Sequence, residues 1–126
     1  MDHSNATGKY YPCLDPILFA PTNFSTEDWM ANAAALGSQE ICLTAHHEGG
    51  FALWPSNHTP YSVKLSTRFQ GGKGDVLRDF VDSANRWGIK ICYYLNVAAN
   101  GYLTHVAQVT PEEFISAEVV VFGILF

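Results

Sequence analysis

Apolar residues recur at helical spacing in two segments of the chain, and each segment has clear start and stop signals. In the first, Ser25 or Thr26 can cap a helix, and acidic residues follow in its first turn. The strong helix formers of residues 29–36 continue it, and Gly37 is expected to end it. Trp29, Ala33 and Leu36 lie at i, i+4 and i+7, which predicts that they form the buried face.

The second helical pattern is the clearer one. Asp75 supplies the cap and Gly88 the stop. The apolar residues between them fall on one face: Val76, Leu77, Phe80, Val81, Ala84 and Trp87. We therefore expect an amphipathic helix over residues 76–87.

Two short apolar runs, EICLTA at residues 40–45 and IKICYYLN at residues 89–96, are typical of buried strands. The resulting order is helix, strand, helix, strand. Alternation of this kind predicts α/β architecture, with parallel strands joined by helical crossovers. A parallel sheet is covered on both faces, and two strands make a poor sheet. The chain therefore resembles a slice of a larger unit.

The remaining segments are expected to be loops. Prolines forbid a continuous helix or a central strand over residues 1–24, which are expected to be loop. Glycines and prolines indicate a long loop over residues 46–74 with a short extended piece at 61–65. The sequence TPEE at residues 110–113 is a strong helix start. GGKGD at residues 71–75 lacks the spacing of a phosphate loop and is interpreted as a turn into the second helix.

The composition narrows the class of protein. The 126 residues carry a formal net charge of −5, 15% charged residues and 13% aromatic residues. These values argue against disorder and against a nucleic-acid partner, since no basic stripe is present. The longest apolar run, residues 119–126, is too short to span a membrane. Few charges also fit a unit whose surface is meant to be covered.

Signals for the compartment conflict. Cys42 and Cys92 lie inside apolar runs and are expected to be buried free thiols, and Cys13 has no motif partner. Three N-x-S/T sequons begin at Asn5, Asn23 and Asn57, which favours a secreted or lysosomal route for the full-length protein. The first residues lack the pattern of a signal peptide.

Polar groups follow both predicted strands, where ligands of parallel α/β folds bind. His46 and His47 come directly after the first strand, and Tyr94 lies near the end of the second. Adjacent histidines could ligate a metal, but no third ligand has a suitable spacing, so we expect no metal and no cofactor.

The stretch from residue 15 to residue 103 closely resembles glycoside hydrolase family 29, the α-L-fucosidases. The most specific block is LTAHHEGGFALWPS at residues 43–56, which resembles a family strand that ends in Lys-His-His-Asp-Gly-Phe before a tryptophan. The other blocks occur in family order: DP and FAPT at residues 15–22, YSV at 61–63, GKGD at 72–75, and GIK with YYLN at 88–96. The whole chain is interpreted as one partial catalytic-barrel domain. Its last part, residues 104–126, diverges from the family or is truncated.

The resemblance implies a (β/α)8-like barrel whose enzymes release terminal α-L-fucose from fucosylated glycans. It implies a sugar-binding role for His46, His47, Glu48, Trp54 and Tyr94. Aligned without a gap, His47 and Glu48 replace the family's paired histidines; a shift of one residue would pair His46 with His47 instead. Both alignments remain open at this point.

Neither the family's nucleophile nor its acid/base has a counterpart here, although retaining hydrolysis needs two carboxyls. We therefore expect a truncated fucosidase that is inactive as these 126 residues alone. A remnant that binds sugar or a partner without catalysis is the alternative, and a metal-dependent barrel hydrolase is a third.

Overall fold

The computed structural model describes residues 13–96, 99–110 and 112. Two long helices and two strands form its main body: α1 (Thr26–Ala35), β1 (Glu40–His46), α2 (Val76–Trp87) and β2 (Lys90–Leu95). Three short 3-10 turns, η1 (Pro16–Leu18), η2 (Val63–Leu65) and η3 (Phe69–Gly72), lie in the connections, and a π-type turn, η4 (Tyr102–Val106), follows β2. Both predicted helices and both predicted strands are therefore confirmed.

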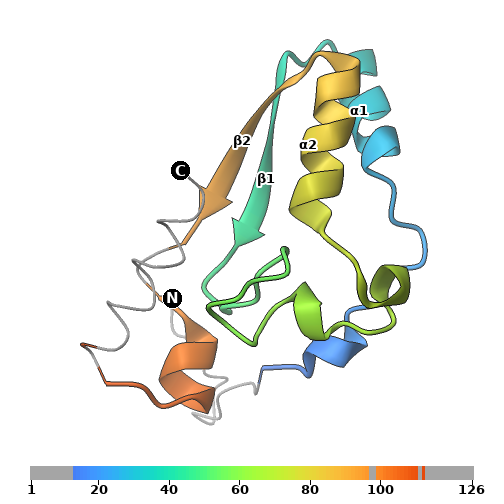
Figure 1. Ribbon diagram of the computed structural model, residues 1–126. Helices are drawn as coiled ribbons and strands as arrows, with labels where there is room; N and C mark the ends of the chain where they lie inside the picture. The colour runs from blue at the N-terminus through green and yellow to red at the C-terminus, as the bar shows by residue number, and fades with distance from the viewer. Residues whose placement is uncertain (1–12, 97–98, 111, 113–126) are drawn as a thin grey trace, which may run out of the picture.

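The two strands are parallel and pair in a simple register. Glu40 lies opposite Lys90, and the pairing continues residue by residue until Thr44 lies opposite Tyr94. The register then shifts, so that His46 pairs with Leu95. Helix α2 connects the strands as a crossover, and Figure 1 shows it beside the sheet with α1 behind it.

The helix ends follow from their capping residues. Ser25 Oγ accepts a hydrogen bond from the backbone N–H of Asp28, and Asp75 Oδ1 accepts one from Arg78. At the other end of α2, Gly88 adopts the left-handed conformation (φ 64°) that a glycine tolerates. The sequence signals for these ends are thus confirmed.

The core lies between the helices and one face of the sheet. Met30, Phe80 and Ala84 are buried there, with the sheet residues Ile41, Leu43, Ile91 and Tyr93 packed against them. A second cluster, centred on Val63, Phe69 and Val76, lies beneath the long loop.

The predicted buried face of α1 was right for Ala33 and wrong for Trp29 and Leu36. Thr26, Met30 and Ala33 are the buried residues, whereas Leu36 is 84% exposed and Trp29 is partly exposed. Those three residues also lie at i, i+4 and i+7, so the sequence offered two overlapping faces. Packing against α2 selected the face with the smaller side chains, which lets the helices approach closely.

The other face of the sheet is open in the described part of the chain. Glu40, Cys42, Thr44, Lys90 and Tyr94 are all exposed there. The expectation of two strands buried on both faces was therefore wrong for these residues, because α1 and α2 both pack on the same side.

The cysteine prediction was also wrong. Cys42 and Cys92 form a disulfide, and their Cα atoms lie 4.5 Å apart at paired register positions. Cys42 is exposed and Cys92 is half-buried on the open face. Parallel register, which the sequence did not reveal, brings together two thiols separated by 50 residues.

Two loop predictions also needed correction. Residues 63–65 form η2 instead of an extended piece, although Ser62 makes an isolated bridge to Ala52. Turn η4 was not anticipated. The predicted helix start at residues 110–113 lies mostly outside the described residues. None of the helices in the described ranges has the length and apolarity to cross a bilayer.

Candidate functional site

The chain reverses direction immediately after β1, and this reversal builds the candidate site. Gly50 N–H donates to the carbonyl of His47 (2.9 Å), which closes a tight turn. Leu53 N–H then donates to Ala45 O (3.1 Å), and Ala52 bridges His46 in antiparallel fashion. Residues 52–54 thereby lie against His46, while His47 in the turn stays exposed.

The ring of His46 is buried and contacts polar groups through both nitrogens. Nδ1 lies 3.2 Å from Asn96 O, and Nε2 lies 3.5 Å from Asn100 Nδ2. A carbonyl oxygen can only accept, so Nδ1 carries the proton and Nε2 accepts from the amide. With 2% of its surface exposed, His46 serves as a support that joins the end of β1 to the segment after β2.

The backbone of Gly50 lies close to the side chain of Asn100, which in turn contacts His46. Asn100 is 5% exposed, and its Oδ1 accepts a hydrogen bond from Leu103 N–H (3.1 Å). A Cβ on Gly50, which has a φ of +87°, would lie 2.1 Å from that same oxygen. Only glycine fits at this position. The turn after β1 and the segment after β2 therefore pack closely against each other.

His47 and Tyr94 lie together at the carboxyl ends of the two strands. Their ring centroids are 5.8 Å apart with an interplanar angle of 35°. His47 is exposed, and 46% of the Tyr94 surface is exposed. An imidazole beside a phenol ring offers directional hydrogen bonds next to an apolar wall, which suits a sugar.

Glu48 and Trp54 occupy the two flanks of the turn. Glu48 is half-buried, and its carbonyl accepts a hydrogen bond from Gly101 N–H (2.7 Å). Trp54 is also half-buried and packs against His46, with ring centroids 6.4 Å apart. Four of the five predicted site residues thus form two ring pairs: buried His46 with half-buried Trp54, and exposed His47 with exposed Tyr94. Glu48 follows His47 in the sequence.

Sequence reasoning missed two residues that shape this site, Gly50 and Asn100. Asn100 precedes Gly101, and an Asn-Gly pair is a turn signal that marked the position without revealing its contact to His46. Gly50 stood within a recognised motif, but its need for a positive φ emerged only from the fold.

An apolar hollow lies beside the same loop. It measures about 280 Å³ and is lined by residues 14–16, 18 and 19 together with Phe51 and Tyr61. Tyr61 stacks on Tyr102 with centroids 4.8 Å apart and planes 7° apart. A wider hollow of about 470 Å³ lies at the opposite, amino-terminal ends of the strands, lined by Glu40, Lys90 and their neighbours.

His46 and His47, the adjacent histidines that could ligate a metal, do not belong to a larger ligand cluster in the described ranges. Within residues 13–96, 99–110 and 112, no group of three or more His, Cys, Asp or Glu side chains could hold an ion. Nitrogen and carboxylate ligands in at least that number are what a protein metal site requires.

Parallel strands with an exposed imidazole and phenol at their carboxyl ends place the described residues among parallel α/β proteins, a class whose ligands bind at that end of the sheet. Comparison with known proteins narrows this class. The family model described as alpha-L-fucosidase matches residues 7–117. The chain belongs to the α-L-fucosidase family.

Individual relatives agree. The chain is 38% identical over 95 residues to alpha-L-fucosidase 1 of Arabidopsis thaliana, a match that covers 75% of the chain and 18% of that protein. It is 43% identical over 82 residues to putative alpha-L-fucosidase 1 of Oryza sativa subsp. japonica, covering 65% of the chain and 16% of the relative. The chain therefore spans less than a fifth of the length of these relatives.

A solved structure also matches. The glycoside hydrolase 29 family member from an unknown rumen bacterium superimposes with a TM-score of 0.69 at 34% identity. The match covers 83% of this chain and 19% of that one. The fold of the described residues is thus part of the fold of larger glycoside hydrolases.

Proposed function

We propose that the chain forms part of the sugar-binding end of an α-L-fucosidase that releases terminal α-L-fucose from fucosylated glycans. The observation that carries this proposal is the exposed pair of His47 and Tyr94, 5.8 Å apart at the carboxyl ends of adjacent parallel strands. Family membership supplies the substrate class, and this pair supplies a surface with the matching chemistry.

The two alignments of the paired histidines are not equally compatible with the geometry. His46 is buried and contacts Asn96 and Asn100, so its ring faces protein groups. His47 is exposed, and Glu48 is half-buried beside it. These contacts favour the gapless alignment, in which His47 and Glu48 hydrogen-bond sugar hydroxyls while His46 and Trp54 support them from below.

We infer further that hydrolysis needs carboxyl groups from outside these 126 residues. A retaining mechanism places two carboxyls roughly 5–5.5 Å apart. The family resemblance assigns neither of them to this chain, and Glu48 is the carboxyl it does assign to sugar binding. The chain alone is thus proposed to bind fucose without cleaving it.

The fold of the whole protein is proposed to be a (β/α)8-like barrel, of which β1 and β2 are two adjacent strands. The open face that carries Cys42, Thr44 and Tyr94 supports this, because parallel sheets are covered on both sides. A closed barrel places the next strands over this face and pairs the free strand edges. We also propose a secreted or lysosomal location for the full-length protein.

Binding of a fucose-configured iminosugar, measured by calorimetry or by NMR titration, tests the proposal. We expect His47→Ala and Tyr94→Ala each to weaken binding roughly tenfold, which corresponds to about 1.4 kcal/mol. His58→Ala is the matched control, because His58 is also exposed but lies in the following loop. If all three variants bind the iminosugar as tightly as wild type, the assignment of the site is wrong.

Activity on an aryl α-L-fucoside tests the inference that hydrolysis needs carboxyl groups from outside these 126 residues. We expect no turnover by the 126-residue chain, and turnover by it would contradict the inference about the carboxyls. A longer product that contains this chain and binds fucose without cleaving it would instead support a non-catalytic binding protein. Stoichiometric zinc binding that is lost in His47→Ala would favour a metal-dependent hydrolase.

A further inference from the structure

Two N-x-S/T sequons lie within the described residues, and neither has a role in the site. Both acceptor asparagines, Asn23 and Asn57, are exposed in irregular loops. The third sequon, at Asn5, lies outside the described residues. A folded protein can accommodate a bulky N-glycan only at an asparagine that lies at its surface, and both asparagines meet this condition.

The turn that carries Asn57 is anchored on either side. Ser56 is 4% exposed, and its Oγ accepts hydrogen bonds from the backbone N–H groups of His58 (3.1 Å) and Thr59 (3.3 Å). Thr59 is 8% exposed, and its Oγ1 accepts from Tyr61 N–H (3.1 Å). Asn57 and His58 are exposed between these two buried hydroxyl residues.

The side-chain contact of Asn57 is compatible with a glycan. Its Oδ1 accepts a hydrogen bond from Lys64 Nζ at 2.6 Å, and this contact is exposed. Attachment of a sugar replaces one hydrogen on Nδ2 and leaves Oδ1 as a carbonyl acceptor. The turn and the lysine contact can therefore both persist in the glycosylated protein.

The disulfide provides an independent observation about the compartment. Cys42 and Cys92 pair across adjacent strands, and such bonds form and persist in oxidising environments such as the endoplasmic reticulum. The same compartment supplies the enzyme and the lipid-linked donor for N-glycosylation. A chain that acquires this disulfide there also exposes its sequons to the glycosylation machinery.

We propose that Asn57 carries an N-linked glycan. In the reaction, Asn57 Nδ2 attacks the anomeric carbon of a lipid-linked oligosaccharide pyrophosphate. The new bond joins carbon to nitrogen, the bond from the anomeric carbon to the pyrophosphate oxygen breaks, and Nδ2 loses one proton. Asn57 is favoured over Asn23 because its sequon ends in threonine, the better acceptor, whereas that of Asn23 ends in serine.

The test is translation of the chain behind a cleavable secretion signal in the presence of eukaryotic microsomes. We expect a product of higher mass whose glycan is removed by peptide N-glycosidase F. This enzyme converts the modified Asn57 to aspartate, which mass spectrometry of the peptide detects. Thr59→Val and Asn57→Gln should both remove the modification. Thr59→Ser, which keeps the sequon and the hydroxyl, and Asn23→Gln should both retain it.

Pro60 follows the sequon and slows its modification, so partial occupancy of Asn57 supports the proposal. An unmodified Asn57, in a reaction where a reporter sequon is modified, overturns it. So does a mass increase that persists in Asn57→Gln and disappears in Asn23→Gln. Because glycan transfer acts on the nascent chain, a variant that folds poorly still gives a readout.

Discussion

At the scale of single residues, the candidate site depends on how tightly Gly50 and Asn100 approach each other. Gly50 combines a positive φ with direct contact to a buried amide, and that amide reaches His46. The exposed His47 depends on this arrangement, because the turn that presents it is closed by the hydrogen bond between Gly50 N–H and His47 O.

We therefore predict that Gly50→Ala lowers the free energy of unfolding by about 1–3 kcal/mol, since alanine at this φ is strained and its Cβ meets Asn100. Urea denaturation followed by circular dichroism measures this change. Gly49→Ala is the control, because a Cβ there has no neighbour within 4 Å and its backbone has no positive φ. Equal loss in both variants would mean that the contact with Asn100 is unimportant.

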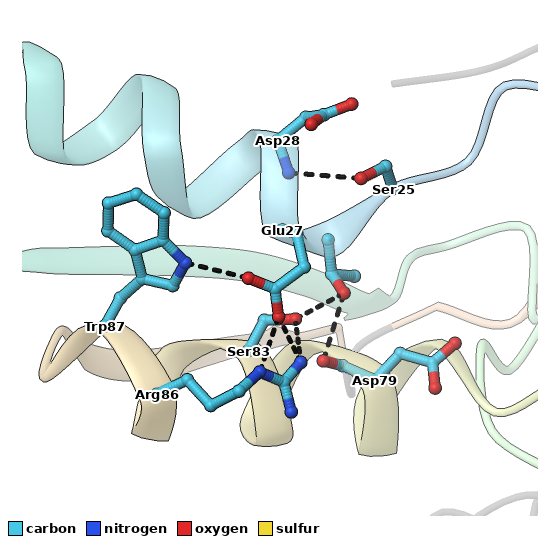
Figure 2. A network of polar contacts seen from close by, with 8 residues as sticks. Ser25, Glu27, Asp28, Asp79, Ser83, Arg86 and Trp87 are labelled. Carbon is cyan, nitrogen blue, oxygen red and sulfur yellow. Dashed lines mark hydrogen bonds and ion pairs between the residues drawn. The ribbon is translucent and has the colours of Figure 1, made fainter.

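At the scale of elements, α1 and α2 are joined by a network of polar contacts, shown in Figure 2. Thr26 Oγ1 donates to Asp79 O (3.1 Å). Ser83 Oγ lies 2.7 Å from Thr26 Oγ1 and can donate its own proton to it. Glu27 accepts hydrogen bonds from the Trp87 indole and forms an ion pair with Arg86. Trp87, which the sequence placed on the apolar face of α2, is 45% exposed, and its indole N–H is part of this network.

The buried hydroxyl pair predicts a coupled loss of stability. Thr26→Val leaves the Ser83 hydroxyl, which is 1% exposed, without its closest partner and should cost about 1–3 kcal/mol. The double variant with Ser83→Ala should cost less than the sum of the two single variants. Chemical denaturation of the four proteins completes the cycle, and simple additivity would show that the two hydroxyls do not interact.

The carboxylate of Glu27 predicts a dependence of stability on pH. The hydrogen bond from Trp87, then that from Arg86, holds the pKa of Glu27 below its ordinary value of 4.5. The charged form is thus favoured in the folded state, and its contribution to stability is present above pH 4.5. That contribution is lost as the pH falls through the lowered pKa.

Melting temperatures of wild type and Glu27→Gln across this pH range measure the effect. We expect the advantage of wild type to vanish below the lowered pKa and to shrink in high salt, because the ion pair is exposed. Glu40→Gln, at an exposed position on β1, is the control. A constant difference between wild type and Glu27→Gln at every pH would contradict the pKa shift.

At the scale of the whole molecule, the described part of the chain is a two-stranded parallel sheet with helices on one side and a long, hydrogen-bonded loop at the carboxyl ends of the strands (Figure 1). The matched part of the chain covers 16–18% of the length of two fucosidase relatives and 19% of a glycoside hydrolase 29 family member. One face of this sheet is open in the described residues. The disulfide between Cys42 and Cys92 lies on that face and is the main long-range covalent constraint there.

Removing that disulfide should destabilise the fold markedly. Closing a loop of 50 residues contributes roughly 4 kcal/mol by loop entropy. We predict that the double variant of Cys42→Ser and Cys92→Ser unfolds at lower urea concentration than wild type, and that a dithiol reductant reproduces the effect. Cys13→Ser should change little, since Cys13 is a free thiol. An unchanged midpoint in the double variant would contradict a stabilising role.

The sequence by itself determined the helices, the strands and their parallel order, because caps at Ser25 and Asp75, the stop at Gly88 and apolar spacing are local signals. It also identified the family through the motif at residues 43–56. It named His46 and His47 as candidates but could not distinguish their environments.

The tertiary structure alone decided which residues meet across long separations. Register brought Cys42 to Cys92, the turn after β1 buried His46 against Asn96 and Asn100, and helix packing turned Met30 inward instead of Leu36. Each of these outcomes depends on contacts between segments far apart in the chain, which local propensity does not encode. For that reason the sequence predicted the elements of this protein, and only their packing distinguished the buried histidine from the exposed one.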